Sequence, residues 1–215
     1  MYLTKDKISN ALRCASVVLA RTEIYAGSES KLAISIDAVT DFIADHCKKE
    51  IVIREVNFEA VHLKGRKESY DTNVVYIDIR QNLPDYTKRF VALKELMHII
   101  VDGAAEDLTP YGDVILEKLV LEGHIGVFSG NGDDPPAQSE LVAEIAAIEV
   151  IYPADRRAAD SAALERGEAT MAALQVRYEA PAAIIGTALN LGYLSVLSAA
   201  MNTTRPKSKT KSAKI

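Results

Sequence analysis

The sequence contains little cysteine, few aromatic residues and no tryptophan. Of its 215 residues, 2 are cysteines and 6% are aromatic, while 48% are hydrophobic and 26% are charged. These proportions are those of an ordinary folded domain, which excludes a disordered chain and a collagen-like repeat. Two cysteines are too few for a disulfide framework or an all-cysteine zinc site, and no apolar run at the N-terminus indicates a signal peptide. We therefore expect a cytoplasmic protein whose core needs no covalent cross-links.

Charge is absent between Glu179 and Arg205, yet this segment does not have the composition of a membrane span. Residues 182–193 are rich in alanine and are interrupted by polar residues and glycine. A spanning helix needs about 20 strongly apolar residues. We therefore expect short helices before and after Gly192, and no membrane anchor.

Negative charge is absent from the C-terminal end. Residues 202–215 contain 5 basic residues and no acidic one, whereas the rest of the chain has 20 basic and 30 acidic residues, a net charge of −10. An acidic body does not suit a protein that binds duplex DNA by neutralising phosphates. Residues 202–215, which are rich in Ser, Thr and Lys, are predicted to form a disordered basic tail, and direct nucleic-acid binding is not expected.

Hydrophobic periodicity predicts two helices, then three short strands, then a helical body. The predicted helices before the strands cover residues 4–21 and 36–48, and the predicted strands cover 51–58, 60–64 and 74–80. The later predicted helices cover residues 85–101, 111–127, 138–151, 155–165, 169–178 and 181–191. Asp85 is the expected N-cap of the first of these. Strands segregated from helices indicate one α+β domain over residues 1–201.

The predicted helix at 85–101 carries the most informative pattern. Its buried stripe contains Phe90, Leu93, Met97 and Ile100. The adjoining face contains Lys94, Glu95, His98 and Asp102. Positions 94 and 98 are one turn apart, which is the spacing of the His-Glu-x-x-His motif, whose histidines bind zinc and whose glutamate acts as a base. Here lysine stands in place of the first histidine.

A second stripe lies on the predicted helix at 138–151. Glu140 and Glu144 share it with Ala143 and Ala147, and such small side chains permit another helix to pack closely. If the two helices cross, Glu140 is suited to be a third metal ligand. The alternative is a salt-bridged surface helix, because glutamate is usually exposed.

Together these segments resemble the motifs of the ImmA/IrrE metallopeptidases. In that family a small N-terminal sheet precedes a helix bearing H-E-x-x-H, and a later helix reads roughly E-x-x-A and then A-E-L-L-M-P. The corresponding segments here are K-E-L-M-H at 94–98, E-L-V-A at 140–143 and A-I-E-V-I-Y-P at 147–153. The resemblance covers about residues 74–194 and implies a zincin-like helical body.

The resemblance also implies roles for individual residues. Glu95 matches the general base, His98 the second zinc ligand and Glu140 the third ligand. Members of the family cleave helix-turn-helix repressors and thereby switch on mobile-element or stress genes. Lys94 departs from the pattern, because a catalytic zinc normally has three protein ligands and a protonated lysine offers no lone pair.

Three arrangements of the site are open at this stage. In the first, the Lys94 ammonium pairs with Glu95 or Glu140, giving a metal-free pseudoenzyme that binds a protein such as a transcriptional regulator. In the second, Asp102 or His124 supplies the missing ligand, and a zinc-bound water attacks a peptide bond. In the third, burial neutralises Lys94, whose nitrogen then binds the metal. We favour the first, with weak or no peptidase activity and no cofactor, because it requires no further change.

Residues 169–190 support a different hypothesis, a DNA-binding helix-turn-helix whose second helix begins after Pro181. A recognition helix needs Arg, Lys, Asn or Gln to read base edges. Residues 182–189 offer only Thr187 as a polar side chain. A DNA-binding regulator is therefore the less favoured hypothesis.

Overall fold

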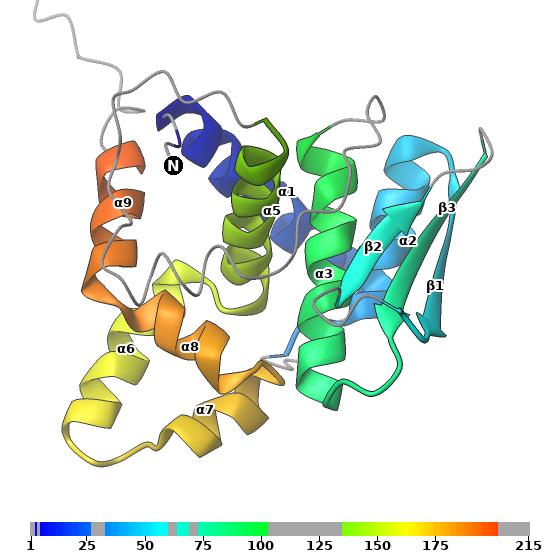
Figure 1. Ribbon diagram of the computed structural model, residues 1–215. Helices are drawn as coiled ribbons and strands as arrows, with labels where there is room; N and C mark the ends of the chain where they lie inside the picture. Colours follow the sequence, from blue (N-terminus) through cyan, green and yellow to red (C-terminus); the bar gives the residue numbers. More distant parts are fainter. Residues whose placement is uncertain are drawn as a thin grey trace, which may run out of the picture.

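The structure is a computed structural model that describes residues 3, 5–26, 33–59, 64–68, 73–102 and 135–201. Its α+β fold, with helices and strands segregated, confirms the predicted fold class (Figure 1). The predicted helix at 111–127 and the predicted tail at 202–215 lie outside the described residues. The elements in chain order are α1 (Lys5–Ala26), α2 (Ile36–Cys47), β1 (Glu50–Val56), β2 (Gly65–Glu68), β3 (Val74–Arg80), α3 (Asp85–Val101), α5 (Pro135–Ile151), α6 (Ala154–Glu165), α7 (Met171–Tyr178), α8 (Ala182–Leu189) and α9 (Leu191–Met201).

The three strands form a mixed sheet in the order β1-β3-β2. Strand β1 runs parallel to β3, with Ile53 opposite Ile77, and β2 runs antiparallel to β3, with Lys67 opposite Ile77. The absence of strand–helix alternation gave no indication of a parallel pair. Here the chain between β1 and β3 contains β2, and none of the described residues between those two strands is helical.

Two local predictions are wrong. Strand β2 begins at Gly65, after the range 60–64 predicted for the second strand; Lys64 is not part of the strand, and residues 60–63 lie outside the described part. The N-cap of α3 is Pro84, which makes no side-chain hydrogen bond. Asp85 is instead the first residue of α3, where its negative charge still interacts favourably with the helix dipole.

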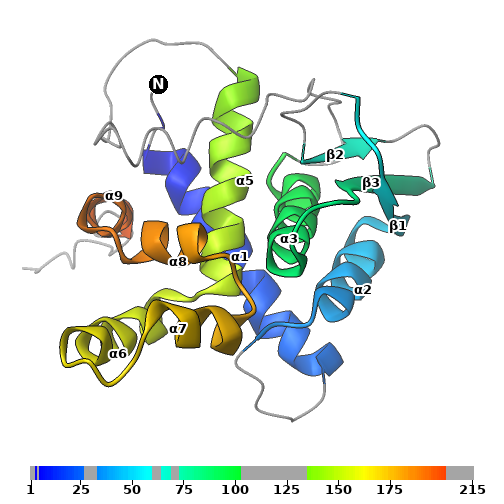
Figure 2. The same ribbon diagram turned by 60° about the horizontal axis from the view of Figure 1, so that its bottom comes forward.

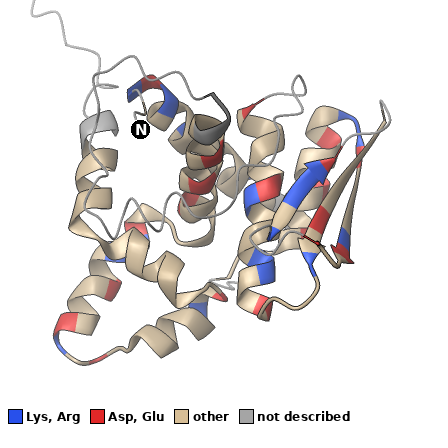
Figure 3. Cartoon of the chain, in the orientation of Figure 1, with Lys and Arg blue, Asp and Glu red and all other residues tan. Residues whose placement is uncertain are grey.

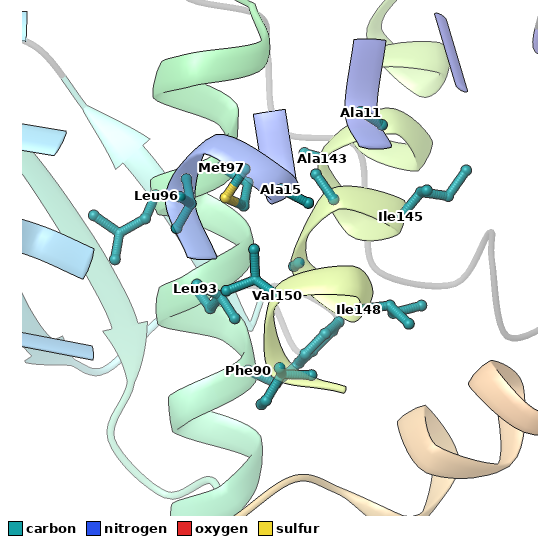
Figure 4. Close-up of a cluster of buried hydrophobic side chains, with 14 of the residues drawn as sticks. Ala11, Ala15, Phe90, Leu93, Leu96, Met97, Ala143, Ile145, Ile148 and Val150 are labelled. Carbon is teal, nitrogen blue, oxygen red and sulfur yellow. The ribbon is translucent and has the colours of Figure 1, made fainter. Parts of the chain in front are cut away.

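Helix α3 lies between the sheet and α5, so it has two buried faces. Helices α2 and α3 pack on one face of the sheet, against Val75, Ile77 and Ile79 of β3 (Figures 1 and 2). On its other face α3 packs against α5 and α1, and the alanines of those two helices allow a close approach. The side chains of this second interface include Leu93 and Met97 of α3, Ala143 and Ile148 of α5, and Ala11 and Ala15 of α1 (Figure 4).

Helices α8 and α9 contain no charged residue, whereas the sheet carries charged residues of both signs (Figure 3). Helix α8 ends at Leu189 and α9 begins at Leu191, which confirms two short helices in the uncharged segment. Within the described residues, no helix combines the length and the apolar character that crossing a membrane requires.

A buried polar network centred on Arg157 joins α5 to the helices that follow it. The Arg157 side chain donates through Nη2 to Glu149 Oε1 at 2.5 Å and through Nε to the carbonyl oxygen of Tyr152 at 3.0 Å. The hydroxyl of Tyr193, on α9, donates to the same Glu149 oxygen at 3.0 Å. The Arg157 side chain therefore closes the C-terminal end of α5, whose last carbonyls lack helical partners.

Asp160 forms the second half of this Arg157 network. Its Oδ2 accepts hydrogen bonds from the hydroxyls of Tyr152 at 3.1 Å and Tyr178 at 2.6 Å, and its Oδ1 accepts one from Arg177 at 2.7 Å. These residues come from the end of α5, from α6 and from α7. The network thus fixes three consecutive helices relative to one another.

Candidate functional site

Four polar side chains lie along one side of the C-terminal half of α3. They are Lys94, Glu95, His98 and Asp102. Only 6% of Lys94, 4% of Glu95 and 6% of His98 is exposed. Charged side chains this buried need partners, because removing an unpaired charge from water is costly.

Helix α5 supplies partners for them from across the helix interface. Glu140 and Ser139 lie near its N-terminal end, where α5 packs against the last turns of α3. The structure therefore brings together Lys94, His98 and Glu140, the three positions that correspond to the ligands of the zinc motif. We call the group formed by Lys94, Glu95, His98, Asp102, Ser139 and Glu140 the Lys94 cluster.

Lys94 lies between two carboxylates. Its Nζ is 2.8 Å from Oε2 of Glu140, on α5, and 3.7 Å from Oε1 of Glu95, its neighbour on α3. The shorter contact is a charge-assisted hydrogen bond between the two helices. A tethered ammonium therefore contacts the carboxylate that a metal ion would have to bind.

His98 is held by Asp102, one turn further along α3. Its Nδ1 is 2.8 Å from Oδ2 of Asp102, and Ser139 donates to the same oxygen at 2.7 Å. Its Nε2 lies 3.3 Å from Oε1 of Glu140, which is an ion-pair distance, but no directed hydrogen bond forms there. Burial lowers the pKa of His98, but Asp102, Glu140 and Glu95 outweigh it and raise that pKa to about 9. This raised pKa favours the imidazolium form of His98.

The carboxylates of the cluster are stabilised in their charged form. Burial alone would raise the pKa of Glu140, but His98 and Lys94 outweigh burial and lower it to about 2. The pKa of Asp102 is also lowered, because the bonds from His98 and Ser139 and the charge of Lys67 together exceed the effect of burial. Lys67, on β2, thus belongs to the surroundings of this site.

Among the residues that the structure describes, the formal charges around the site balance. Lys67, Lys94 and protonated His98 carry three positive charges, and the three negative charges belong to the acids of the cluster, Glu95, Asp102 and Glu140. Because metal ligands must be deprotonated, a divalent cation would have to displace protons from such a cluster before it could bind.

Strand β2 closes the side of the site next to Glu95. A Cβ on Gly65 would overlap Cγ1 of Val91 and would lie 3.3 Å from Oε1 of Glu95. Only glycine therefore lets the backbone of β2 approach α3 this closely. Neither Gly65 nor Lys67 was identified from sequence, because the second strand was predicted to end before them.

The described residues do not fit a catalytic zinc. Such a site needs three protein ligands, and the sequence pattern supplies only His98 and Glu140, since Lys94 already pairs with Glu140. Asp102 contacts Nδ1 of His98, on the opposite side of the ring from Nε2, so it orients the ring. Among the described residues, no group of three His, Cys, Asp or Glu side chains is arranged to hold a metal ion. His124 lies outside the described residues.

The proposed helix-turn-helix corresponds to α7 and α8. Thr170 caps α7 by accepting a hydrogen bond from the backbone N–H of Ala173 at 3.1 Å. The exposed positions of α8 include Ala182, Ala183 and Gly186, and Thr187 is buried. These exposed positions carry no donor or acceptor side chain for base edges.

Comparison with known proteins assigns no family. No protein-family model, curated protein or solved structure matches this chain. Functional inference therefore starts from the Lys94 cluster.

Proposed function

We propose that this chain is a metal-free, ImmA/IrrE-like pseudopeptidase that acts in regulation by binding a protein partner, such as a helix-turn-helix transcriptional regulator. The single observation that supports the metal-free state most strongly is the 2.8 Å contact between Lys94 Nζ and Glu140 Oε2. The ammonium has no lone pair for a metal, and it neutralises the carboxylate that would otherwise attract one.

Hydrolysis also lacks support at this site. A zinc peptidase needs a metal-activated water and a carboxylate base within hydrogen-bond reach of it. Here the Oε1 atom of Glu95 lies 3.7 Å from the Lys94 ammonium. The proposed class of partner, a helix-turn-helix regulator, rests on the resemblance of residues 94–98 and 140–153 to the motifs of the family. That resemblance does not depend on whether the protein has peptidase activity.

The experiment compares the metal content of the purified wild-type protein with that of the Lys94→His variant. Wild type should contain almost no zinc, whereas Lys94→His should gain zinc, because an imidazole then joins His98 and Glu140 as a third ligand. The matched control is Lys88→His, since Lys88 is on α3 but pairs with Glu55, away from the cluster. It should stay empty of metal.

Two further variants make this test sharper. Lys94→His combined with Glu140→Gln should lose the gained zinc if Glu140 is a ligand. Stoichiometric zinc in wild type would overturn the proposal and favour the active peptidase. In that case, loss of zinc in Asp102→Ala or His124→Ala would identify the substitute ligand.

A further inference from the structure

The sheet has one face that no described helix covers. Helices α2 and α3 both pack on the side of β3 that carries Val75 and Ile77 (Figures 1 and 2). Side chains directly opposite one another on neighbouring strands point to the same side, and Asp78 is opposite both Arg54 on β1 and Arg66 on β2. We define the outer sheet face by the residues Arg54, Phe58, Arg66, Tyr76, Asp78 and Arg80.

The acidic groups on this face are covered by arginines. The Asp78 side chain is 2% exposed, and each of its oxygens is held by one arginine, Oδ1 by Arg54 at 2.7 Å and Oδ2 by Arg66 at 3.2 Å. The arginine side chains themselves are 39% and 38% exposed. Glu68, which pairs with Arg66 at 2.7 Å, is 13% exposed. The charge that this row presents to solvent is therefore positive.

Both arginines keep donors for a further anion. The contacts of Arg54 and Arg66 with Asp78 and Glu68 run through Nε and Nη2. More than a third of each arginine side chain is exposed, which leaves part of each guanidinium open to solvent. A guanidinium has five N–H donors in a fixed plane, so a carboxylate in solution can pair with the outer edge while the inner edge holds Asp78.

Aromatic rings hold the guanidinium planes in place. Arg54 lies over the ring of Tyr76 at 4.2 Å from its centroid, and the ring of Phe58 has Arg66 at 5.4 Å and Arg80 at 5.6 Å. These cation–π contacts order the arginines before any partner arrives. They also occupy ring faces on which the bases of a single-stranded nucleic acid would stack.

We propose that the outer sheet face is a docking surface for an acidic segment of a partner protein, whose carboxylates pair with the outer edges of Arg54 and Arg66. The rest of the chain is acidic, since residues 1–201 have a net charge of −10. A long polyanion meets that repulsion, whereas a short acidic segment contacts only this face. The surface lies on the side of the sheet opposite α3, so this proposal does not rest on the metal-free state of the Lys94 cluster.

The experiment measures the fluorescence anisotropy of a short labelled poly-glutamate peptide in the presence of the full chain. Wild type should bind it, and binding should weaken as salt rises from about 0.1 M to about 1 M, where the Debye length falls from about 10 Å to about 3 Å. Arg66→Gln should weaken binding about tenfold through loss of a charge-assisted hydrogen bond. Arg166→Gln is the matched control, because Arg166 is an exposed arginine on another surface that pairs with Glu168, and its affinity should equal that of wild type.

Several results would overturn the proposal. The first is that wild type does not bind the peptide, and the second is that Arg66→Gln and Arg166→Gln weaken peptide binding equally. The third is that single-stranded poly-thymidine binds more tightly than the peptide with the same dependence on Arg66, which would make the face a nucleic-acid surface. If Arg66→Gln does not fold, Arg66→Lys serves in its place. It keeps the charge and loses the planar fork, so it should bind more weakly than wild type; affinity equal to that of wild type would also contradict the proposal.

Discussion

The two ends of α5 carry glutamates whose pKa values are displaced in opposite directions. At the N-terminal end, Glu140 contacts both Lys94 and His98, and its pKa is lowered to about 2. At the C-terminal end, the pKa of Glu149 is raised, because burial outweighs the contributions of Arg157 and Tyr193. The side chain of Glu140 is 22% exposed and that of Glu149 is 8% exposed.

The difference shows that burial of charge does not by itself mark a functional site. Both clusters are hydrogen-bonded and both join helices. In the Arg157 network, the guanidinium donates hydrogen bonds both to Glu149 and to the carbonyl oxygen of Tyr152, so its role is to close a helix end. In the Lys94 cluster, two cations converge on one partly open carboxylate, an arrangement that favours the charged forms and that an external group can reach.

The largest expected effect comes from breaking the Arg157 network. Arg157→Met should lower the free energy of unfolding by about 3–5 kcal/mol, because Glu149 is left as an unpaired buried charge. Urea denaturation measures this. Arg166→Met, which removes an exposed ion pair with Glu168, should change stability by less than about 0.5 kcal/mol.

A double variant tests whether the stability comes from the pairing of Arg157 with Glu149 or from either residue alone. Arg157→Met combined with Glu149→Leu should restore most of the lost stability, since an apolar pair replaces a buried ion pair at little cost. A double variant as unstable as Arg157→Met alone would mean that the helix-end carbonyl of Tyr152, not Glu149, is what Arg157 mainly serves.

The next effect is a pH dependence of stability that comes from the Lys94 cluster. The folded pKa of His98 is about 9, against about 6.5 in the unfolded chain. Its contribution to stability is therefore fully present below about pH 6.5 and is lost as the pH rises through about 9, by an amount on the order of 3 kcal/mol. On the acid side, Glu140 stabilises above its unfolded pKa and loses that contribution as the pH falls towards about 2.

Urea denaturation across this pH range, compared between wild type and His98→Gln, isolates the alkaline loss. The free energy of unfolding of the variant should be lower than that of wild type near about pH 6. This difference should disappear towards about pH 10, as the pKa shift of His98 requires. His46→Gln, a change at an exposed histidine of α2, should follow wild type throughout. A constant gap between His98→Gln and wild type would contradict the charge-based account.

The smallest effect tests the support of His98 by Ser139. Ser139→Ala should lower the free energy of unfolding by about 1 kcal/mol and raise the pKa of Asp102, because one of the donors that stabilise its charged form is removed. The Asp102 carboxyl carbon, followed by NMR, reports that titration. Ser16→Ala, which removes an exposed hydroxyl bonded to the Leu12 carbonyl on α1, serves as the control and should leave Asp102 unchanged.

Periodicity was sufficient to predict the framework of the fold and of the site. Helical spacing predicted that Lys94 and His98 share one side of α3, and the alanines at 143 and 147 predicted close packing of α5. These inferences succeed because they depend on residues within a few helical turns. The positions of Gly65 and Lys67 depend on how β2 meets α3, and no local pattern specifies that register.

The Arg157 network shows the limit of such inference more clearly. The helix that contains Arg157 reads as polar and exposed, with Arg156 beside it, and nothing local distinguishes the two arginines. One is buried because its partners come from α5 and α9, which are distant in sequence. Burial of a charged side chain is thus a property of the packed helices.

The ammonium that joins α3 to α5 is part of the covalent chain. A bound ion dissociates, competes with other ions and is withdrawn by chelating agents, whereas Lys94 is always present at the same effective concentration. If the chain is metal-free as proposed, we expect the junction of these two helices to stay closed in buffers containing EDTA.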